Sequence, residues 1–212
     1  MLKIRRETPA DYAVVEEITR QAFYNIYMPG CVEHYLVHIM RTHTDFIPEL
    51  ALVLELDGEI VGNVMYTKAR LVAAAGAEKQ IVTFGPVCVR PDLQRRGYGK
   101  KLLAYSFDLA AQMGYEAIVI FGSPVNYVGL GFQSCARYSI SVENGQYPAA
   151  MLVKELKPGA LSGESWVYHD SPIMNIDEAA AQAYDDTLPK MARRHTPSQE
   201  EFYIMSNSFI QK

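Results

Sequence analysis

Alternating apolar and polar residues predict strands in the first half of the chain. Residues 51–56 and 59–66 alternate on either side of an Asp-Gly pair at 57–58. Asp-Gly supplies the two left-handed residues of a tight turn, so we predict a β-hairpin here. The next such run, 80–89, contains Pro86, which has no N–H to donate to a ladder. We therefore predict a further strand with a bulge at its Gly-Pro step.

Helical spacing appears in two stretches. Residues 8–22 open with Thr-Pro-Ala-Asp, a helix start with a capping acid, and continue with apolar residues three or four apart. Residues 100–113 predict a second helix that Gly114 ends in the left-handed conformation. Its expected apolar face consists of Leu102, Leu103, Leu109, Ala110 and Met113. The continuous apolar run 117–121 predicts a strand buried on both faces, and strand, helix and strand together predict a right-handed βαβ unit.

The pattern weakens beyond residue 139. Strands are predicted at 151–153 and 166–168, a helix at 177–184, and a last helix that opens with a capping box at 196–199. We expect a core of residues 1–139 and a C-terminal extension of residues 140–212 packed on it as a lid, an extra layer or a dimer arm. The aromatic, His-rich segment 24–46 is a candidate for the wall of a substrate pocket.

Composition and charge narrow the class of protein. The 212 residues are 49% hydrophobic and 21% charged, with a net charge of −4, which argues against a nucleic-acid binder. The three cysteines, Cys31, Cys88 and Cys135, are scattered, and no apolar run approaches the ~18 residues of a membrane span. The first residues lack a signal-peptide pattern. We expect a cytoplasmic protein without nucleic-acid or membrane partners.

The residues between the strand at 80–89 and the helix at 100–113 carry the main functional signal. They read Gln94-Arg95-Arg96-Gly97-Tyr98-Gly99, and Lys100 follows. Small residues let a backbone curl so that several N–H groups point into one space, and the helix adds the positive end of its dipole. Such a loop suits a pyrophosphate, with the backbone as the main ligand. The glycine spacing fits neither a Walker A loop nor a dinucleotide fingerprint.

This loop resembles the acetyl-coenzyme A (acetyl-CoA) pyrophosphate motif of the GNAT acetyltransferases, Gln/Arg-x-x-Gly-x-Gly/Ala. Residues 87–91 resemble the family's fourth strand, whose backbone pairs with the pantetheine arm of the cofactor. Residues 126–132 resemble its Tyr-x-x-x-Gly-Phe element, with Asn126 where an aromatic is common. The resemblance extends from residue 2 to residue 132. Phe84-Gly85-Pro86-Val87 resembles a mostly uncharacterised bacterial branch of the superfamily.

The resemblance implies an α/β fold: a mixed, twisted β-sheet flanked by helices, with its central parallel strands splayed. It implies direct transfer of an acetyl group from acetyl-CoA to a primary amine of a small molecule or peptide in a ternary complex, without a metal. Tyr127 becomes the expected acid for the leaving thiolate, since a phenol with a pKa near 10 suits that task. A homodimer is possible. The expected cofactor-binding residues are Val87, Cys88, Val89, Gln94, Arg95, Arg96, Gly97, Tyr98, Gly99, Lys100 and Asn126.

Several alternatives stay open. The strand at 80–89 has no carboxylate or histidine in its apolar part, so the general base is unassigned, and Glu33 and Glu49 have only their charge to favour them. Cys88 fits a small core residue better than an acyl-carrying nucleophile. The spacing of the histidines at 34, 38 and 43 argues against a metal site. A CoA-binding sensor without activity and an acetyltransferase acting on a protein partner are the rival functions.

Overall fold

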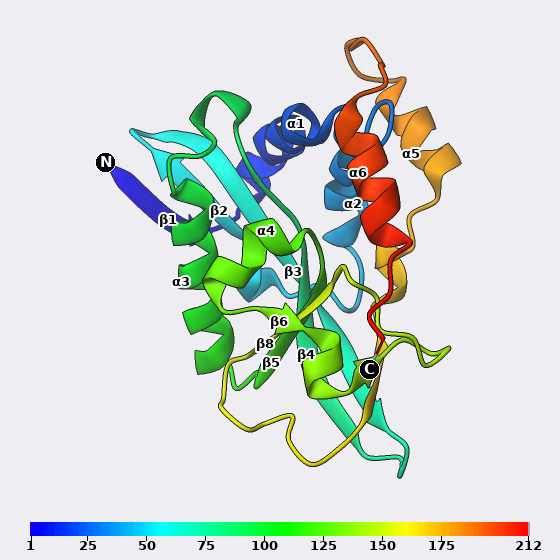
Figure 1. The fold of residues 1–212 in the computed structure, drawn as a ribbon. Helices are drawn as coiled ribbons and strands as arrows, with labels where there is room; N and C mark the ends of the chain where they lie inside the picture. The colour runs from blue at the N-terminus through cyan, green and yellow to red at the C-terminus, as the bar shows by residue number, and fades with distance from the viewer. Residues whose placement is uncertain (212) are drawn as a thin grey trace.

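One nine-stranded β-sheet organises the chain in the computed structural model, which describes residues 1–211 (Figure 1). The strand order is β1-β2-β3-β4-β5-β8-β6, and β9 pairs with the far end of β3 and with β7. The strands are β1 (Leu2–Arg6), β2 (Leu52–Leu56), β3 (Glu59–Ala73), β4 (Glu78–Val89), β5 (Ala117–Phe121), β6 (Gln133–Ser134), β7 (Ile140–Ser141), β8 (Met151–Glu155) and β9 (Trp166–His169).

Helices cover both faces of this sheet. The α-helices are α1 (Tyr12–Phe23), α2 (Glu33–Met40), α3 (Tyr98–Gln112), α4 (Pro124–Tyr127), α5 (Glu178–Asp185) and α6 (Pro197–Ser206). Short 3-10 helices lie at Pro9–Asp11, Pro48–Leu50, Pro91–Leu93, Val128–Leu130, Cys135–Tyr138 and Pro172–Met174. The predicted mixed α/β architecture is confirmed.

The predicted hairpin and bulge are both present. Asp57 and Gly58 have φ angles of 53° and 90° and join β2 to β3 in antiparallel register. Between β3 and β4 the register shifts, because Val64 pairs with Val87 whereas Tyr66 pairs with Phe84. The two residues of β3 thus span three of β4, which places the extra residue at the Gly-Pro step.

The parallel strands β4 and β5 are splayed, as the resemblance implied. Their only register pair is Val82 with Ile118, and the crossover between them is α3. Beyond Val82, β4 continues to Val89 with β3 on one edge and no strand of residues 1–211 on the other. A strand that loses its neighbour leaves backbone hydrogen-bonding groups free along that edge.

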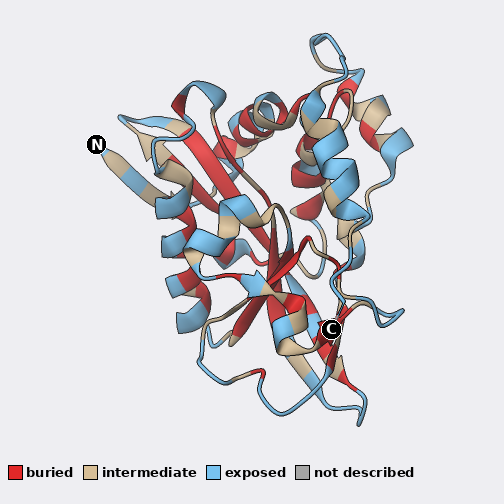
Figure 2. Ribbon diagram, in the orientation of Figure 1, coloured by how far each residue is buried: buried red, intermediate tan, exposed pale blue. Residues whose placement is uncertain are grey.

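Alternation along the strands divides the core into two faces (Figure 2). Leu52 and Leu54 of β2 join the cluster under α3, whereas Val53 between them packs against α1 and α2. The predicted apolar face of α3 is wrong at its end: Met113 is 39% exposed, and Phe107 is buried in the core instead.

Residues 140–211 add strands to the same sheet. β8 pairs with β5 along its full length, and β9 extends the far end of β3. The last helix forms where predicted, but its capping box is wrong. The Thr196 hydroxyl donates to the Asn25 carbonyl at 2.7 Å, so it ties the helix to another segment and not to its own backbone. Within residues 1–211, every helix is too short or too polar to span a bilayer.

Candidate active site

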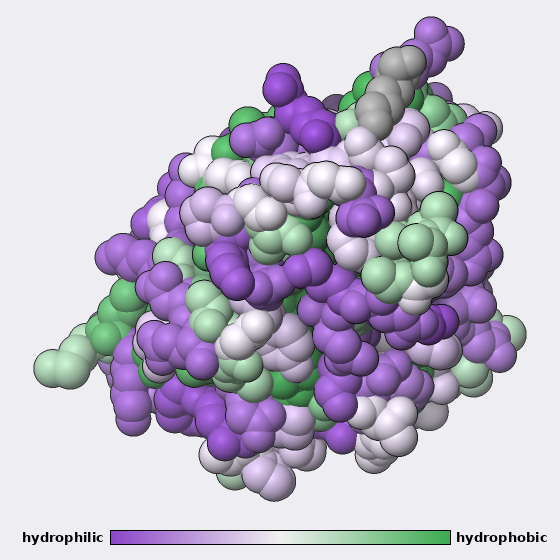
Figure 3. All heavy atoms as spheres, turned by 90° about the horizontal axis from the view of Figure 1, so that it is seen from below, coloured by the Kyte–Doolittle hydropathy of each residue, from purple (hydrophilic) through white to green (hydrophobic). Residues whose placement is uncertain are grey.

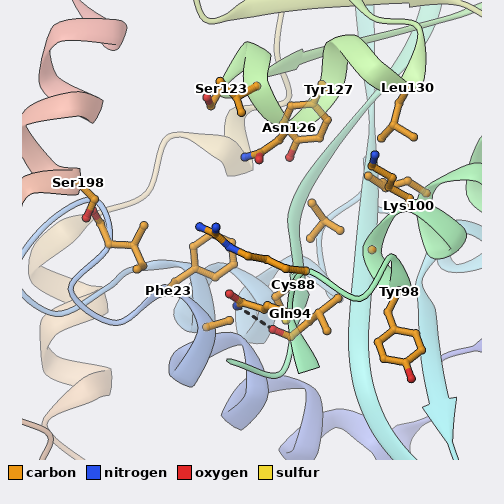
Figure 4. Close-up of a pocket in the computed structure, with 18 of the residues that line it drawn as sticks. Phe23, Cys88, Gln94, Tyr98, Lys100, Ser123, Asn126, Tyr127, Leu130 and Ser198 are labelled. Atoms are coloured by element: carbon orange, nitrogen blue, oxygen red, sulfur yellow. Dashed lines mark hydrogen bonds between the residues drawn. The ribbon is translucent and has the colours of Figure 1, made fainter. Parts of the chain in front are cut away.

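A cavity of about 1000 Å³ opens where β4 and β5 diverge (Figure 4). Its lining comes from five places: the end of α1, the end of β4, the loop into α3, α4, and one side of α6. Of the twelve residues that the sequence proposed for the site, all but Arg96 lie on the cavity wall. Arg96 is exposed and faces elsewhere, near Asp92.

The loop of residues 94–100, here called the glycine loop, presents a run of free backbone donors. Arg95 and Gly97 have φ angles of 59° and 83°, and Gly97 caps α3. The six consecutive N–H groups from Arg95 to Lys100 have no hydrogen-bond partner within residues 1–211. A helix start explains only the last few of these. A Cβ on Gly97 would meet no atom within 4 Å, so the space beside Gly97 is open.

The side chains of the glycine loop have different surroundings. Gln94 donates its amide N–H to the Val89 carbonyl at 3.0 Å and so ties the loop to the end of β4 (Figure 4). Arg95 and Lys100 are exposed on the cavity wall and are its only cationic side chains within residues 1–211. Positive charge beside free N–H groups favours an anion at this end of the cavity.

Cys88 is held as a core residue, as the alternation predicted. Its thiol donates to Asn63 Oδ1 at 2.8 Å and lies 3.7 Å from the Thr19 hydroxyl on α1. Burial raises the pKa of the Cys88 thiol to about 12, so the thiolate is negligible at neutral pH. Its sulfur is therefore unsuited to carry an acyl group. With Val87 and Val89 it forms the part of β4 that borders the cavity.

Tyr127 lies across the cavity from the glycine loop, beside Asn126 (Figure 4). Its ring clusters with those of Phe84 and Phe132, with both centroid distances 5.8 Å. Burial raises the pKa of the phenol well above its ordinary value of 10.0, and nearby Tyr27 raises it further. The Tyr127 hydroxyl has no hydrogen-bond partner within residues 1–211. The geometry thus presents a fixed, protonated phenol with a free O–H.

Gly122 is a position beside Tyr127 that the sequence analysis did not single out. A Cβ at Gly122 would lie 2.5 Å from Cε2 of Tyr127, closer than side chains tolerate. The absent side chain therefore makes room for the catalytic candidate's ring. The sequence showed Gly122 only as part of a Gly-Ser-Pro chain break, because the contact spans five residues and a turn.

The sequence analysis also did not predict which residues line the end of the cavity away from the glycine loop. That end is lined by Phe23 at the end of α1, by Tyr27 after it, and by Ser198, Glu201, Phe202 and Met205 of α6. We call these six residues the α6 end. The positions on α6 are spaced three, four and seven apart, which is one face of a helix. That spacing in the sequence indicates one helix face, but the neighbouring residues do not indicate which part of the protein the face covers.

The suggested role for residues 24–46 holds only at their start, where Ile26 and Tyr27 line the cavity. The three histidines lie apart. His34 is buried 3.3 Å from Asp185, His38 stacks on Tyr184, and His43 faces Asp45. Within residues 1–211, no group of three or more His, Cys, Asp or Glu side chains is arranged to hold a metal ion.

The two carboxylates considered as general bases do not line the cavity. Glu33 accepts the Val32 N–H at 3.1 Å, has no cationic partner within residues 1–211, and burial raises its pKa to about 7. Burial raises the pKa of Tyr27 on the cavity wall, and the charge of Glu33 raises it further. Glu49 is at the opposite side of the fold, 3.9 Å from Arg6. The one acid on the cavity wall among the described residues is Glu201.

The model of the "Acetyltransferase (GNAT) family" matches residues 20–132, more than half of the chain. The chain belongs to this family. The GNAT match includes the end of α1, β4, the glycine loop and Tyr127, and it stops before α6. The sequence-based identification is therefore confirmed, and the protein is an acetyltransferase homologue.

Similar proteins support the same assignment. The uncharacterized N-acetyltransferase YhbS of Escherichia coli K12 is 28% identical over 170 residues, covering 79% of this chain and 96% of YhbS. The crystal structure of E. coli YhbS in complex with CoA matches with a TM-score of 0.71 at 24% identity, over 82% of this chain and 92% of that one.

A GNAT acetyltransferase from Brucella melitensis, solved in complex with acetyl-CoA, matches with a TM-score of 0.64 at 22% identity. The alignment covers 82% of this chain and 98% of that protein. At these identities the two solved structures show that the fold is shared.

Proposed function

We propose that this protein transfers an acetyl group from acetyl-CoA to a primary amine by direct attack within a ternary complex. The observation that carries the proposal is the run of six unpaired N–H groups on the glycine loop, facing the same cavity as the free phenol of Tyr127. Thioester chemistry needs both an anchor for the cofactor and a proton donor for the thiolate.

The residues present fit acetyl-CoA. The glycine loop offers N–H groups to a pyrophosphate, and Arg95 and Lys100 add positive charge beside them. The free edge of β4 from Val87 to Val89 suits the amide groups of a pantetheine arm. Gln94 would position the loop through its bond to Val89. The complexes of E. coli YhbS with CoA and of the Brucella protein with acetyl-CoA support this choice.

Acetyl-CoA supplies the activated acyl group, and the chain's own residues move the proton. The amine nitrogen forms a bond to the acetyl carbonyl carbon while the C–S bond breaks. The Tyr127 phenol gives its proton to the departing thiolate, and the proton that the amine loses passes through water to restore the phenol. Burial keeps the Tyr127 phenol protonated but makes it a weaker acid than an ordinary phenol, so its proton moves only as negative charge develops on the sulfur.

The position of α6 favours a small molecule or a flexible peptide end over a folded protein as the acceptor. Its Glu201 and Phe202 close the side of the cavity opposite the glycine loop. We therefore propose that the cofactor elements lie within residues 1–139, whereas residues 140–212 shape the acceptor side. A purely CoA-binding sensor would have no use for a fixed phenol without a partner, which supports catalysis.

The test is the affinity for acetyl-CoA of a Gly99→Val variant. A Cβ at Gly99 meets only Val89 Cγ2 at 3.7 Å, so the fold should tolerate it while the two methyl groups obstruct the loop. We expect calorimetry to show that the dissociation constant for acetyl-CoA rises at least about tenfold, equivalent to a loss of ~1.4 kcal/mol of binding free energy. Ala111→Val, an exposed β-branched change in the same helix, is the matched control. A folded Gly99→Val variant with wild-type affinity would refute the assignment of the loop.

A further inference from the structure

The α6 end of the cavity has an apolar surface that is only partly covered by packing. Within residues 1–211, α6 has no buried residue, and Phe202 is 37% exposed although it faces the cavity (Figure 2). A helix usually gains its stability by burying one face. The face seen from below the molecule is mixed, with hydrophobic patches among hydrophilic residues (Figure 3). The cavity-facing side of α6 is therefore available to a ligand.

Both ends of α6 are tied to the body of the protein. At its start, Thr196 and Ser198 donate to the carbonyls of Asn25 and Ile26 at 2.7 and 2.8 Å. After its end, the Ala149 N–H donates to the Ser208 carbonyl at 2.8 Å. Hydrogen bonds thus hold the helix in place across the cavity, although its side chains contribute little to the core.

Charge separates along the cavity. The cationic side chains, Arg95 and Lys100, lie at the glycine loop, whereas Glu201 is the only acid on the wall among the described residues. Figure 4 shows Lys100 and Ser198 on opposite sides of the cavity. Glu201 follows Ser198 by about one turn of α6. Glu201 has no hydrogen-bond or ion-pair partner within residues 1–211. An unpaired carboxylate beside apolar surface favours a cation.

Aromatic rings line the part of the cavity near this carboxylate. Tyr27, Phe23 and Phe202 share the cavity wall with Tyr127. The Tyr27 ring lies 4.7 Å from that of Phe202, and Phe23 packs on Tyr27 at 5.9 Å. A molecule that reaches from Tyr127 toward Glu201 therefore passes along aromatic faces, which favour flat rings and cations.

We propose that the acceptor is an alkyl amine that carries an aromatic ring and a second positive charge: its ring packs against Tyr27 and Phe202, and Glu201 pairs with the second charge while the other amine is acetylated. This rests on the proposed acetyltransferase function. The charge that Glu201 holds is not that of the reacting amine, because that nitrogen must be neutral to attack and a carboxylate beside it would favour its protonated form.

The test compares three amines that differ in one feature each. They are 1,4-bis(aminomethyl)benzene, with a ring and two amines; benzylamine, with the ring and one amine; and 1,6-diaminohexane, with two amines and no ring. Release of CoA thiol gives kcat/KM for each. We expect the aromatic diamine to exceed each of the others by about fivefold or more, as a partly exposed ion pair or an aromatic contact of ~1 kcal/mol would produce.

Two pairs of variants assign these preferences to residues. Glu201→Gln should bring the ratio of the aromatic diamine to benzylamine toward one, whereas Glu200→Gln, an exposed neighbour off the cavity, should leave the ratio as in wild type. Phe202→Leu should reduce the preference for the ring over 1,6-diaminohexane. Tyr203→Leu is its control, since Tyr203 is 63% exposed and off the cavity.

The possible outcomes separate this inference from the proposed function. Equal kcat/KM values for the three amines, or ratios that Glu201→Gln does not change, would overturn the inference and leave the acetyltransferase intact. Acetyl-CoA that binds by calorimetry without acetylation of any of the three amines would also overturn the acceptor class. Failure of the wild-type protein to bind acetyl-CoA would instead refute the proposed function.

Discussion

Gly122→Ala should slow catalysis by displacing the Tyr127 ring. The added Cβ would lie 2.5 Å from Tyr127 Cε2, whereas ordinary contact begins at 3.4 Å, so the ring must withdraw by about 0.9 Å. The ring is not free to move, because it packs against Phe84 and Phe132, whose rings also contact each other at 6.1 Å. Misplacing a reacting group by 1 Å costs roughly 10²-fold in rate. Overpacking of this kind also destabilises by about 1–3 kcal/mol.

The assay is CoA release at saturating acetyl-CoA and amine, with the folded fraction checked by thermal unfolding. Gly129→Ala is the matched control, since a Cβ there meets no atom within 4 Å in the same segment. We expect kcat to fall about 10²-fold for Gly122→Ala and to stay near wild type for Gly129→Ala.

A double variant shows whether the loss acts through the phenol. In a Tyr127→Phe background the hydroxyl is already absent, so adding Gly122→Ala should cost much less than in wild type. A folded Gly122→Ala enzyme with wild-type kcat would refute the reasoning, because the close contact would then have no bearing on the chemistry. Full additivity in the double variant would show that Gly122 acts elsewhere.

Two further predictions concern single side chains. Tyr127→Phe should lower kcat by ~10²–10⁴-fold with little change in acetyl-CoA affinity, and a loss of less than about threefold would make Tyr127 a packing residue. Burial lowers the pKa of His34 below its usual 6.5 despite the nearby Asp185 carboxylate, so the unfolded chain binds the proton first. Stability should therefore fall as pH drops through about 6.5, and less so in His34→Gln; exposed His195→Gln is the control, and equal pH dependence in both variants would contradict this.

Features of the fold that depend on local chemistry could be predicted from the sequence. Asp57 and Gly58 form the tight turn because few residues tolerate positive φ. Pro86 forces the bulge because it lacks an N–H. The features that the sequence analysis predicted wrongly depend on tertiary contacts. Thr196 has the pattern of a helix cap, but the Asn25 carbonyl takes its hydroxyl. Met113 continues the helical period past the core into solvent.

In the candidate site, too, some residues could be predicted from local sequence and others could not. The glycine loop was predictable, because its donors come from consecutive residues whose backbone conformation the glycines determine. The roles of Gly122 and Glu201 were not predictable, since they depend on which side chain or space lies opposite each residue in the folded chain. The open edge of β4 was expected only from the family resemblance, because divergence of two strands leaves no mark in either sequence.

A crystal structure with acetyl-CoA bound would show whether the glycine loop and Tyr127 hold the cofactor as proposed. We predict pyrophosphate oxygens at hydrogen-bond distance, about 3 Å, from several N–H groups between Arg95 and Lys100. We also predict the thioester sulfur beside the Tyr127 hydroxyl, with the acetyl group directed toward α6. A pyrophosphate bound away from the glycine loop, or a sulfur out of reach of Tyr127, would contradict the account.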